Sequence, residues 1–293
     1  MSALAATVEE LRNDREHGAS WMARRAVEAL LEANKEPAES SDALVDSLIK
    51  AGRQLSEARP GVGAIAGASG RVLAAANAHR YLDPDELRRM IDEEAEGLLD
   101  GRRRAAASIA IQLQERLAGS VVVTHSASAT VREALVHTPP ARAICTVSDP
   151  IGEGRAFAEE LRGEGLTVEL VEDADGAAAL DDATLLLLGA DTVFRDGTLS
   201  NKIGTTALAE AAAARSTPVV VACEIIKLAP IDAAAAPEKS AAERVLFEFT
   251  PPHLITEIVT EEGGVSSDGV GALVDRTPFL REGYALLLPT AAL

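Results

Sequence analysis

The chain has 293 residues, enough for one large or two modest domains, and its 47% hydrophobic and 25% charged residues exclude general disorder. The formal net charge is −18 and only five residues are lysine, so we expect no direct nucleic-acid binding, which needs clustered lysine and arginine. No apolar stretch reaches the roughly 20 residues of a membrane span, and the N-terminus lacks the apolar region of a signal peptide, so we expect a cytoplasmic protein without a membrane partner.

Residues 1–118 are predicted to form a helical N-terminal domain of about five helices. Within Pro84–Leu99, apolar residues recur at helical spacing, and acidic and arginine residues occupy the opposite face. Asp83 before Pro84 is typical of a helix N-cap followed by proline in the first turn. The glycine-rich stretch Gly61–Gly70 is expected to interrupt the helices, and Gly119–Ser120 to end the region.

Short apolar runs recur after Gly119 and predict strands. These runs are Val121–Thr124, Ala143–Val147, Thr167–Val171, Leu185–Gly189, Pro218–Ala222, Leu254–Val259 and Tyr284–Leu288. Helical stretches lie between them, such as Ala129–Val136, Gly154–Gly163 and Thr205–Ala214. Continuous apolar runs indicate strands buried on both faces, and alternation with helices indicates right-handed βαβ units. Residues 119–293 are therefore predicted to form a Rossmann-like, doubly wound parallel-sheet domain, and the chain to be of the α/β class.

The residues that follow each apolar run form the candidate site, because ligands of doubly wound sheets bind outside the carboxyl ends of the strands. These residues are His125, Ser126, Ser148, Asp149, Asp191 and Glu224. After Asp191, the sequence Asn-Lys-Ile-Gly-Thr at 201–205 is expected to open a helix. Free amides at that helix start, the Lys202 ammonium and the Asn201 side chain would then converge on one phosphate. On spacing alone, an N-capped helix with a solvated lysine is the alternative.

Cys145 and Cys223 both lie in apolar runs, and we expect buried free thiols in a reducing compartment rather than a disulfide. No cluster of cysteine and histidine has the spacing of metal ligands. No Gly-x-Gly-x-x-Gly follows the first predicted strand, and Gly152-Glu153-Gly154 after the second is too short a match. A nucleotide-dependent oxidoreductase is therefore a weak alternative, and no cofactor is expected.

Several motifs together resemble one known family. They are Ala58-Arg59-Pro60, Thr124-His125, Gly189-Ala190-Asp191, Asn201-Lys202-Ile203-Gly204-Thr205, Cys223-Glu224 with Lys227, and Thr250-Pro251-Pro252 before Leu254-Ile255-Thr256. In this order they resemble the family that joins the alpha, beta and delta regulatory subunits of translation initiation factor 2B with isomerases of ribose-1,5-bisphosphate and methylthioribose-1-phosphate. The resemblance implies a helical N-terminal domain, a Rossmann-like C-terminal domain, and homo-oligomeric assembly through the latter.

The resemblance also implies a set of ligand-binding residues: Gly18, Ala19, Arg59, His125, Asn201, Lys202, Gly204, Thr205, Glu224 and Lys227. If the protein is active, Asp191 and Ser126 are the catalytic residues that it implies. Other roles stay open for three of these side chains. Asp191 can fix the following turn, Ser126 can cap the next helix, and Glu224 can pair with Lys227 across the pocket mouth or be solvated.

Three departures from the isomerases of this family concern the chemistry. Ser126 stands where they carry a cysteine, and a serine hydroxyl is a poor proton donor near neutral pH with no partner base visible nearby in sequence. Asp149 stands where they carry an arginine that would face a phosphate. Near the N-terminus, His17-Gly18-Ala19, with Arg15 two residues earlier, replaces their Arg-Gly-Ala.

Two functions therefore compete. The first is a noncatalytic regulatory or binding protein of the initiation-factor-2B type, with a pocket for a sugar phosphate or nucleotide and with initiation factor 2 subunits as possible partners. The second is an aldose–ketose isomerase of a phosphorylated pentose such as ribose-1,5-bisphosphate, with Asp191 as base and Ser126 or a water as acid. The missing thiol favours the first.

The acidic, lysine-poor composition also suits a cytoplasm with high salt, where repulsion between like charges is screened over a few ångströms. A salt-loving source is the corresponding hypothesis. An acidic protein from an organism of ordinary salt is the alternative.

Overall fold

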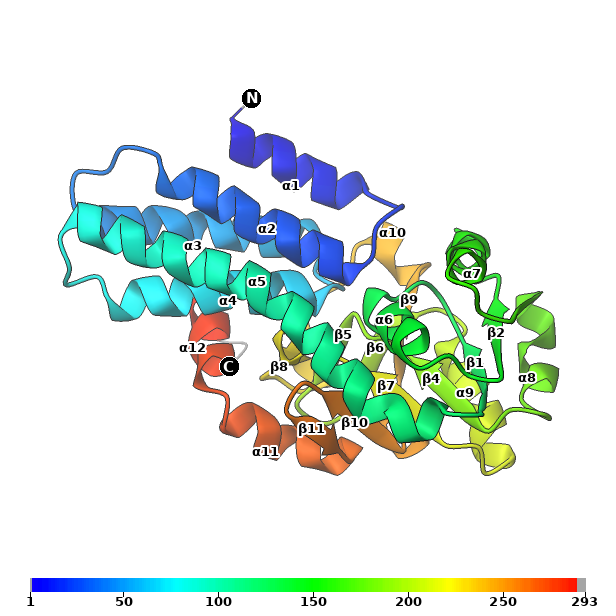
Figure 1. Cartoon of the computed structure of the whole chain (residues 1–293). Coiled ribbons are helices and arrows are strands. Elements are labelled where there is room, and N and C mark those ends of the chain that lie inside the picture. Colours follow the sequence, from blue (N-terminus) through cyan, green and yellow to red (C-terminus); the bar gives the residue numbers. More distant parts are fainter. Residues whose placement is uncertain (1, 289–293) are drawn as a thin grey trace.

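The first part of the chain forms helices, as its apolar spacing predicts. The computed structural model describes residues 2–288 (Figure 1). Its N-terminal helices are α1 (Ala3–Asn13), α2 (Ala19–Asn34), α3 (Ser41–Ala58), α4 (Gly63–Ala78) and α5 (Pro84–Leu117). Asp83 is the N-cap of α5, and its carboxylate accepts hydrogen bonds from the amides of Asp85 and Glu86, which confirms the predicted cap.

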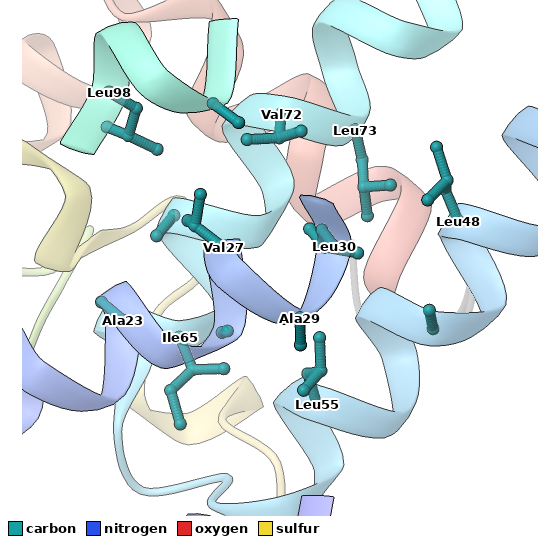
Figure 2. Packing of buried hydrophobic residues seen from close by; sticks show 14 of the residues in the cluster. Ala23, Val27, Ala29, Leu30, Leu48, Leu55, Ile65, Val72, Leu73 and Leu98 are labelled. Atoms are coloured by element: carbon teal, nitrogen blue, oxygen red, sulfur yellow. The ribbon is translucent and has the colours of Figure 1, made fainter. Parts of the chain in front are cut away.

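The apolar faces of α2, α3, α4 and α5 meet in one core (Figure 2). Leu30 of α2, Leu48 of α3 and Leu73 of α4 are fully buried there. Each such side chain contributes roughly 1.5–3 kcal/mol when it leaves water. Aromatic residues are few, so leucine, valine and alanine fill this core and the helices approach one another closely.

The expected break at Gly61–Gly70 is wrong, because α4 runs through most of it. The small residues serve close packing instead of ending the helix. A Cβ at Gly67 would lie 1.8 Å from the carbonyl oxygen of Ile226, in the short helix η2 (Ile225–Lys227). Glycine at this position therefore lets α4 rest directly on the backbone that follows the central sheet.

The seven-stranded sheet has the order β11-β10-β7-β4-β1-β2-β3. Its strands are β1 (Val121–Thr124), β2 (Arg142–Thr146), β3 (Val168–Val171), β4 (Leu185–Leu188), β7 (Val219–Ala222), β10 (Glu257–Thr260) and β11 (Gly263–Val265). All neighbours pair in parallel except β10 and β11. The Rossmann-like, mostly parallel sheet predicted from the sequence is thus confirmed.

Helices cover both faces of this sheet (Figure 1). The remaining helices are α6 (Ala129–His137), α7 (Glu153–Gly163), α8 (Gly176–Ala179), α9 (Thr205–Ala214), α10 (Ala241–Arg244), α11 (Val270–Asp275) and α12 (Pro278–Leu287). Val122 faces the core under α5, α6 and α7, whereas Val123 faces the core under α9 and α11. Successive strand residues thus enter different cores, which explains the continuous apolar runs in the sequence.

Cys145 and Cys223 are buried free thiols in these two cores, as expected.

A second, four-stranded sheet was missed by the sequence reading. It has the order β8-β5-β6-β9. Its strands are β5 (Thr192–Phe194), β6 (Leu199–Lys202), β8 (Leu228–Ala229) and β9 (Phe247–Thr250). Asp196 and Gly197, the latter with φ +80°, form the turn between β5 and β6, a hairpin signal present in the sequence. Asn201 and Lys202 therefore end a strand and do not open a helix.

The predicted strand at Tyr284–Leu288 is also wrong, since most of it belongs to α12. Leu280, Tyr284 and Leu287 are buried at helical spacing, and Pro278 opens the helix. A short apolar run fits a strand or a buried helix equally well, so the sequence pattern alone did not distinguish the two. α12 packs against α4, so the end of the described chain returns to the helical region (Figure 1).

The order of the strands fixes where a crevice opens. From β1 the chain moves outward through β2 and β3, and then crosses to β4 on the other side of β1. The loops that leave β1 and β4 therefore diverge at the carboxyl ends of adjacent strands, which is where doubly wound sheets bind ligands. Along residues 2–288, no helix combines the length and the apolar content needed to cross a membrane.

Substituting Gly67 with alanine should destabilise the fold by about 2–4 kcal/mol, because the new methyl group collides with the Ile226 carbonyl. The matched control is Gly97→Ala on α5, where a Cβ meets nothing within 4 Å. That change should stabilise the protein by up to about 1 kcal/mol through helix propensity. Urea unfolding followed by circular dichroism measures both. Equal effects of the two substitutions would contradict the proposed packing of α4.

Candidate functional site

A pocket of about 260 Å³ lies at the diverging strand ends. The start of α2 closes it from the helical region, and residues that follow β1 and β4 line it from the sheets together with the last two residues of β6. This volume lies at the lower end of small-molecule sites. The lining includes the predicted residues Gly18, Ala19, Arg59, His125, Ser126, Asp191, Asn201, Lys202 and Lys227. The pocket therefore unites most of the predicted site.

Asp191 follows β4 and carries the carboxyl group with the most perturbed pKa in this pocket. Burial raises the pKa of Asp191 to about 6, although the positive charges of Lys227 and Arg59 act in the opposite direction. Within residues 2–288, its carboxylate makes no hydrogen bond and no ion pair. The alternative that Asp191 fixes the following turn is therefore wrong, since the Asp196 side chain accepts the turn amide of Thr198 instead.

Lys227 supplies a buried positive charge to the same pocket. Its side chain is 3% exposed and stands at the end of η2. No carboxylate of the described chain lies within 4 Å of its ammonium, and no hydrogen bond holds it. An unpaired buried ammonium is costly, so this site favours an anionic ligand.

Glu224 does not pair with Lys227 and does not line the pocket, which corrects its expected role in ligand binding. Its carboxylate accepts hydrogen bonds from Nε and Nη2 of Arg102 at 2.9 and 3.0 Å, and from Oγ of Ser20 at 2.9 Å. Burial pushes its pKa upward, but the hydrogen bonds and charge of Arg102 outweigh this and hold the pKa of Glu224 below its ordinary value. Glu224 thus fixes the start of α2 and the middle of α5 at the end of β7.

Ser126 has a partner that the sequence reading missed. Its Oγ donates to Oε1 of Glu153 at 2.6 Å, and Oε2 of Glu153 accepts from Nζ of Lys202 at 2.9 Å. Ser126 does not cap the next helix, because the N-cap of α6 is Ser128. Glu153 lies 27 residues further along the chain, so only the parallel packing of β1 and β2 brings the two side chains together.

His125 lines the pocket but is only 2% exposed, and both of its ring nitrogens contact protein atoms. Its Nε2 lies 2.8 Å from the carbonyl oxygen of Ile203, which accepts only, so Nε2 carries the proton. Nδ1 then accepts from the hydroxyl of Thr146 at 2.6 Å. Burial lowers the pKa of His125, so the ring is neutral and anchors the residue after β6.

The anion site predicted at the start of α9 is already filled by a side chain. The amides of Gly204 and Thr206 donate to Oε1 of Glu248, at 3.0 and 2.8 Å. Gly204 and Thr205 do not line the pocket. Asn201 lines it, and its Nδ2 donates to Oγ1 of Thr205. A carboxylate on β9 thus takes the place expected for a phosphate.

The start of α2 is the helix N-terminus that does face the pocket. Gly18 is its N-cap and provides no side-chain cap, and there is no acidic residue in the first turn. Among the described residues, nothing accepts hydrogen bonds from the amides of Ala19 and Ser20. Arg15 lines the pocket beside them. Free amides and an arginine at one wall favour a negatively charged group.

Arg59 was expected to bind the ligand and Asp149 to place a negative charge at the phosphate, and their contacts differ from these expectations. Arg59 is 4% exposed, donates through Nη1 to the carbonyl oxygen of Asp14 at 2.7 Å, and lies 3.6 Å from Glu243. Burial lowers its pKa, and its main contacts hold the loop before α2. Asp149 is exposed and does not line the pocket, so the negative charge expected from it comes from Glu153 instead.

Lys239 is a second residue that the sequence did not indicate, after the alanine-rich loop 233–236. Its Nζ donates to Oγ of Ser200 at 3.1 Å and lies 4.0 Å from the ring centroid of Phe249. Burial lowers the pKa of Lys239 to about 8. It adds to the positive field around Asp191 without lining the pocket.

Comparisons with known proteins agree with this architecture. The sequence profile of the Initiation factor 2 subunit family matches residues 15–267. A Pyrococcus furiosus protein named translation initiation factor eIF-2B subunit 2-like is 32% identical over 273 residues, 87% of this chain and 94% of that protein. A ribose 1,5-bisphosphate isomerase of Haloterrigena turkmenica is 30% identical over 306 residues, 93% of each chain.

The fold itself is shared with a solved structure. A chain of the tetrameric eIF2B-beta2-delta2 complex of Chaetomium thermophilum superposes with a TM-score of 0.76 at 21% identity, over 93% of both chains. The family resemblance read from the motifs is thus confirmed. The names of the similar proteins include both initiation factors and an isomerase, so similarity alone does not choose between the two functions.

The raised pKa of Asp191 predicts a pH-dependent effect of Asp191→Asn. The folded protein retains the proton up to about pH 6, whereas the unfolded chain loses it near pH 4, so wild-type stability falls as the pH rises through this window. Relative to Asp191→Asn, the wild type should lose roughly 2.5 kcal/mol of unfolding free energy between pH 4 and pH 7.5.

Urea unfolding at the two pH values measures this difference. The exposed Asp149→Asn, outside the pocket, is the matched control and should lack the effect. A constant difference between wild type and Asp191→Asn at both pH values would show that the Asp191 carboxyl is not perturbed.

Proposed function

The chain belongs to the initiation factor 2 subunit family, and from this membership we propose that it is a noncatalytic regulatory protein of the initiation-factor-2B type whose pocket binds a small phosphorylated molecule. The buried, unpaired Lys227 is the observation that carries the binding role. Arg15 and the free amides of Ala19 and Ser20 supply further groups for a phosphate at the same pocket.

The noncatalytic part of the proposal rests on Ser126. An isomerase moves a proton between neighbouring carbons and needs an acid and a base near the sugar. The hydroxyl of Ser126 donates to the Glu153 carboxylate, and a hydroxyl beside an anion holds its proton more firmly than a free one. Loss of one such group is worth roughly 10²–10⁴ in rate.

The oligomeric state and the cellular compartment are questions separate from the ligand. A similar chain forms part of a tetrameric complex, and we propose that this protein is a cytoplasmic homo-oligomer with initiation factor 2 subunits as its macromolecular partners. Sedimentation of the purified protein and pull-down of those subunits address these points separately from the ligand.

An isomerase of a phosphorylated pentose is the second candidate, and one observation favours it. The carboxyl of Asp191 is unpaired and its pKa is about 6, which suits a general base near neutral pH. Glu153 also gives Ser126 a hydrogen-bond partner that the sequence alone did not show.

Replacing Lys227 with methionine should weaken binding of a phosphorylated ligand at least about thirtyfold, because a desolvated cation that faces a phosphate contributes several kcal/mol. Thermal-shift screening of ribose 5-phosphate and adenosine monophosphate identifies a ligand, and calorimetry measures its affinity. Lys50→Met, on the exposed face of α3, is the matched control and should bind like the wild type. Equal binding by Lys227→Met would contradict the proposed anion site.

Incubation with ribose 1,5-bisphosphate and methylthioribose 1-phosphate, followed by NMR, tests the isomerase alternative. We expect no ketose product above the background of a protein-free sample. Steady turnover that disappears in Asp191→Asn would overturn the noncatalytic proposal, whereas product that persists in that variant would come from a contaminant.

A further inference from the structure

Two lysines line the pocket, and only one of them is available to a ligand. Lys202 and Lys227 are each 3% exposed. The ammonium of Lys202 pairs with Glu153 at 2.9 Å, whereas Lys227 has no carboxylate within 4 Å in the part of the chain that the structure describes. Of the three arginines in the lining, Arg132 pairs with Glu160 and Arg59 lies 3.6 Å from Glu243. Arg15 has no carboxylate within 4 Å in the described chain, and it lines the pocket beside the start of α2. The pocket thus has cationic groups for one phosphate, on the side of Lys227 and the start of α2.

The backbone holds Glu153 where it neutralises Lys202. Glu153 is the first residue of α7, where the helix dipole stabilises a carboxylate. A Cβ at the next residue, Gly154, would lie 1.9 Å from the carbonyl oxygen of Thr146, so the start of α7 rests directly on the end of β2. The Gly154 amide also donates to the carbonyl oxygen of Val147 at 3.0 Å. Glu153 therefore points into the pocket from a fixed position.

Both carboxylate oxygens of Glu153 are bound, one by Ser126 and the other by Lys202. Moving this side chain aside would break two charge-assisted hydrogen bonds and leave Lys202 buried without a partner. A phosphate that approaches Lys202 would meet the fixed negative charge of Glu153 a few ångströms away.

We infer that Glu153 is a selectivity residue, which makes the pocket accept a ligand with one phosphate group and reject a ligand with two. This inference rests on the proposed binding of a phosphorylated small molecule, and it names the class of that ligand. A first phosphate is bound by Lys227 and the free amides of α2. A second phosphate would need Lys202, which Glu153 neutralises.

Calorimetric titration of the full chain with ribose 5-phosphate and with ribose 1,5-bisphosphate tests the inference. The wild type should bind the monophosphate at least about tenfold more tightly, because like charges in a low-dielectric pocket repel strongly. Glu153→Gln keeps the shape and removes the charge, and it should shift the affinity ratio toward the bisphosphate at least about tenfold. Glu159→Gln is the matched control on the exposed face of the same helix, and it should keep the wild-type ratio.

Glu153→Ala supplies the same comparison if Glu153→Gln does not fold, and circular dichroism checks both. A wild type that prefers the bisphosphate, or a folded variant of Glu153 with an unchanged ratio, overturns the selectivity role while the phosphate pocket stands. Failure of wild type and variants to bind either compound contradicts the proposed function, and the selectivity role with it.

Discussion

The buried carboxylate of Glu224 joins three elements that are far apart in the sequence. It lies at the end of β7 and binds the guanidinium of Arg102 on α5 and the hydroxyl of Ser20 on α2. Arg102 also donates to the carbonyl oxygen of Ser20 at 2.6 Å, so the first turn of α2 is held from two sides. Because this turn forms one wall of the pocket, the position of the free amides of Ala19 and Ser20 depends on Glu224. A buried ion pair of this kind adds little net stability, but losing one partner leaves an uncompensated charge, which fixes the geometry strongly.

The same principle explains how charge is distributed around the pocket. Glu153 forms an ion pair with Lys202, and Glu243 lies near Arg59. Glu248 accepts hydrogen bonds from the amides at the start of α9. Each of these carboxylates neutralises a group that an anionic ligand would otherwise use. The groups of the pocket without a carboxylate partner are then Arg15, the ammonium of Lys227 and the free amides at the start of α2. They stand beside the Asp191 carboxyl, whose pKa burial raises to about 6. This distribution of charge supports the proposed binding of a small anion, and we attribute the proposed selectivity to the charges that are already paired.

The structure also clarifies how a shared fold can carry both regulation and catalysis. The doubly wound sheet fixes the crevice between β1 and β4 whatever the chemistry of its side chains. His125 supports this geometry, since its ring connects the end of β1 to β2 and to the carbonyl that follows β6. On the proposed noncatalytic role, Ser126 leaves this framework and the binding site intact while the acid of the isomerases is missing. Binding and turnover would then separate within one family through few substitutions.

Local sequence pattern was enough to predict the features that depend on neighbouring residues. Apolar runs predicted the parallel strands and their burial on both faces, and the order of strands and helices placed Asp191, His125 and Ser126 at one edge of the sheet. Predictions from the local pattern were wrong where the same residue type is compatible with two different structures. Gly67 permits close packing as well as a break, and the apolar run from Tyr284 to Leu287 fits a helix as well as a strand. The division of the chain at residue 118 stays a prediction, and α5 contributes to both the helical core and the core under the sheet.

Which charged side chains lack a partner depends on contacts between residues far apart in the sequence. Glu153 lies 27 residues from Ser126, Arg102 lies 122 residues from Glu224, and Glu248 lies 44 residues from Gly204, so no spacing rule links them. Glu153 meets Ser126 because β1 and β2 are parallel, Arg102 meets Glu224 because α5 packs on the central sheet, and Glu248 meets Gly204 because β9 pairs antiparallel with β6. Ion pairs depend on distances between side chains in the folded protein, and the spacing of residues along the sequence does not predict these distances. For that reason the sequence predicted the pocket and its residue types, whereas the fold shows that, within residues 2–288, Lys202 has a carboxylate partner and Lys227 has none within 4 Å.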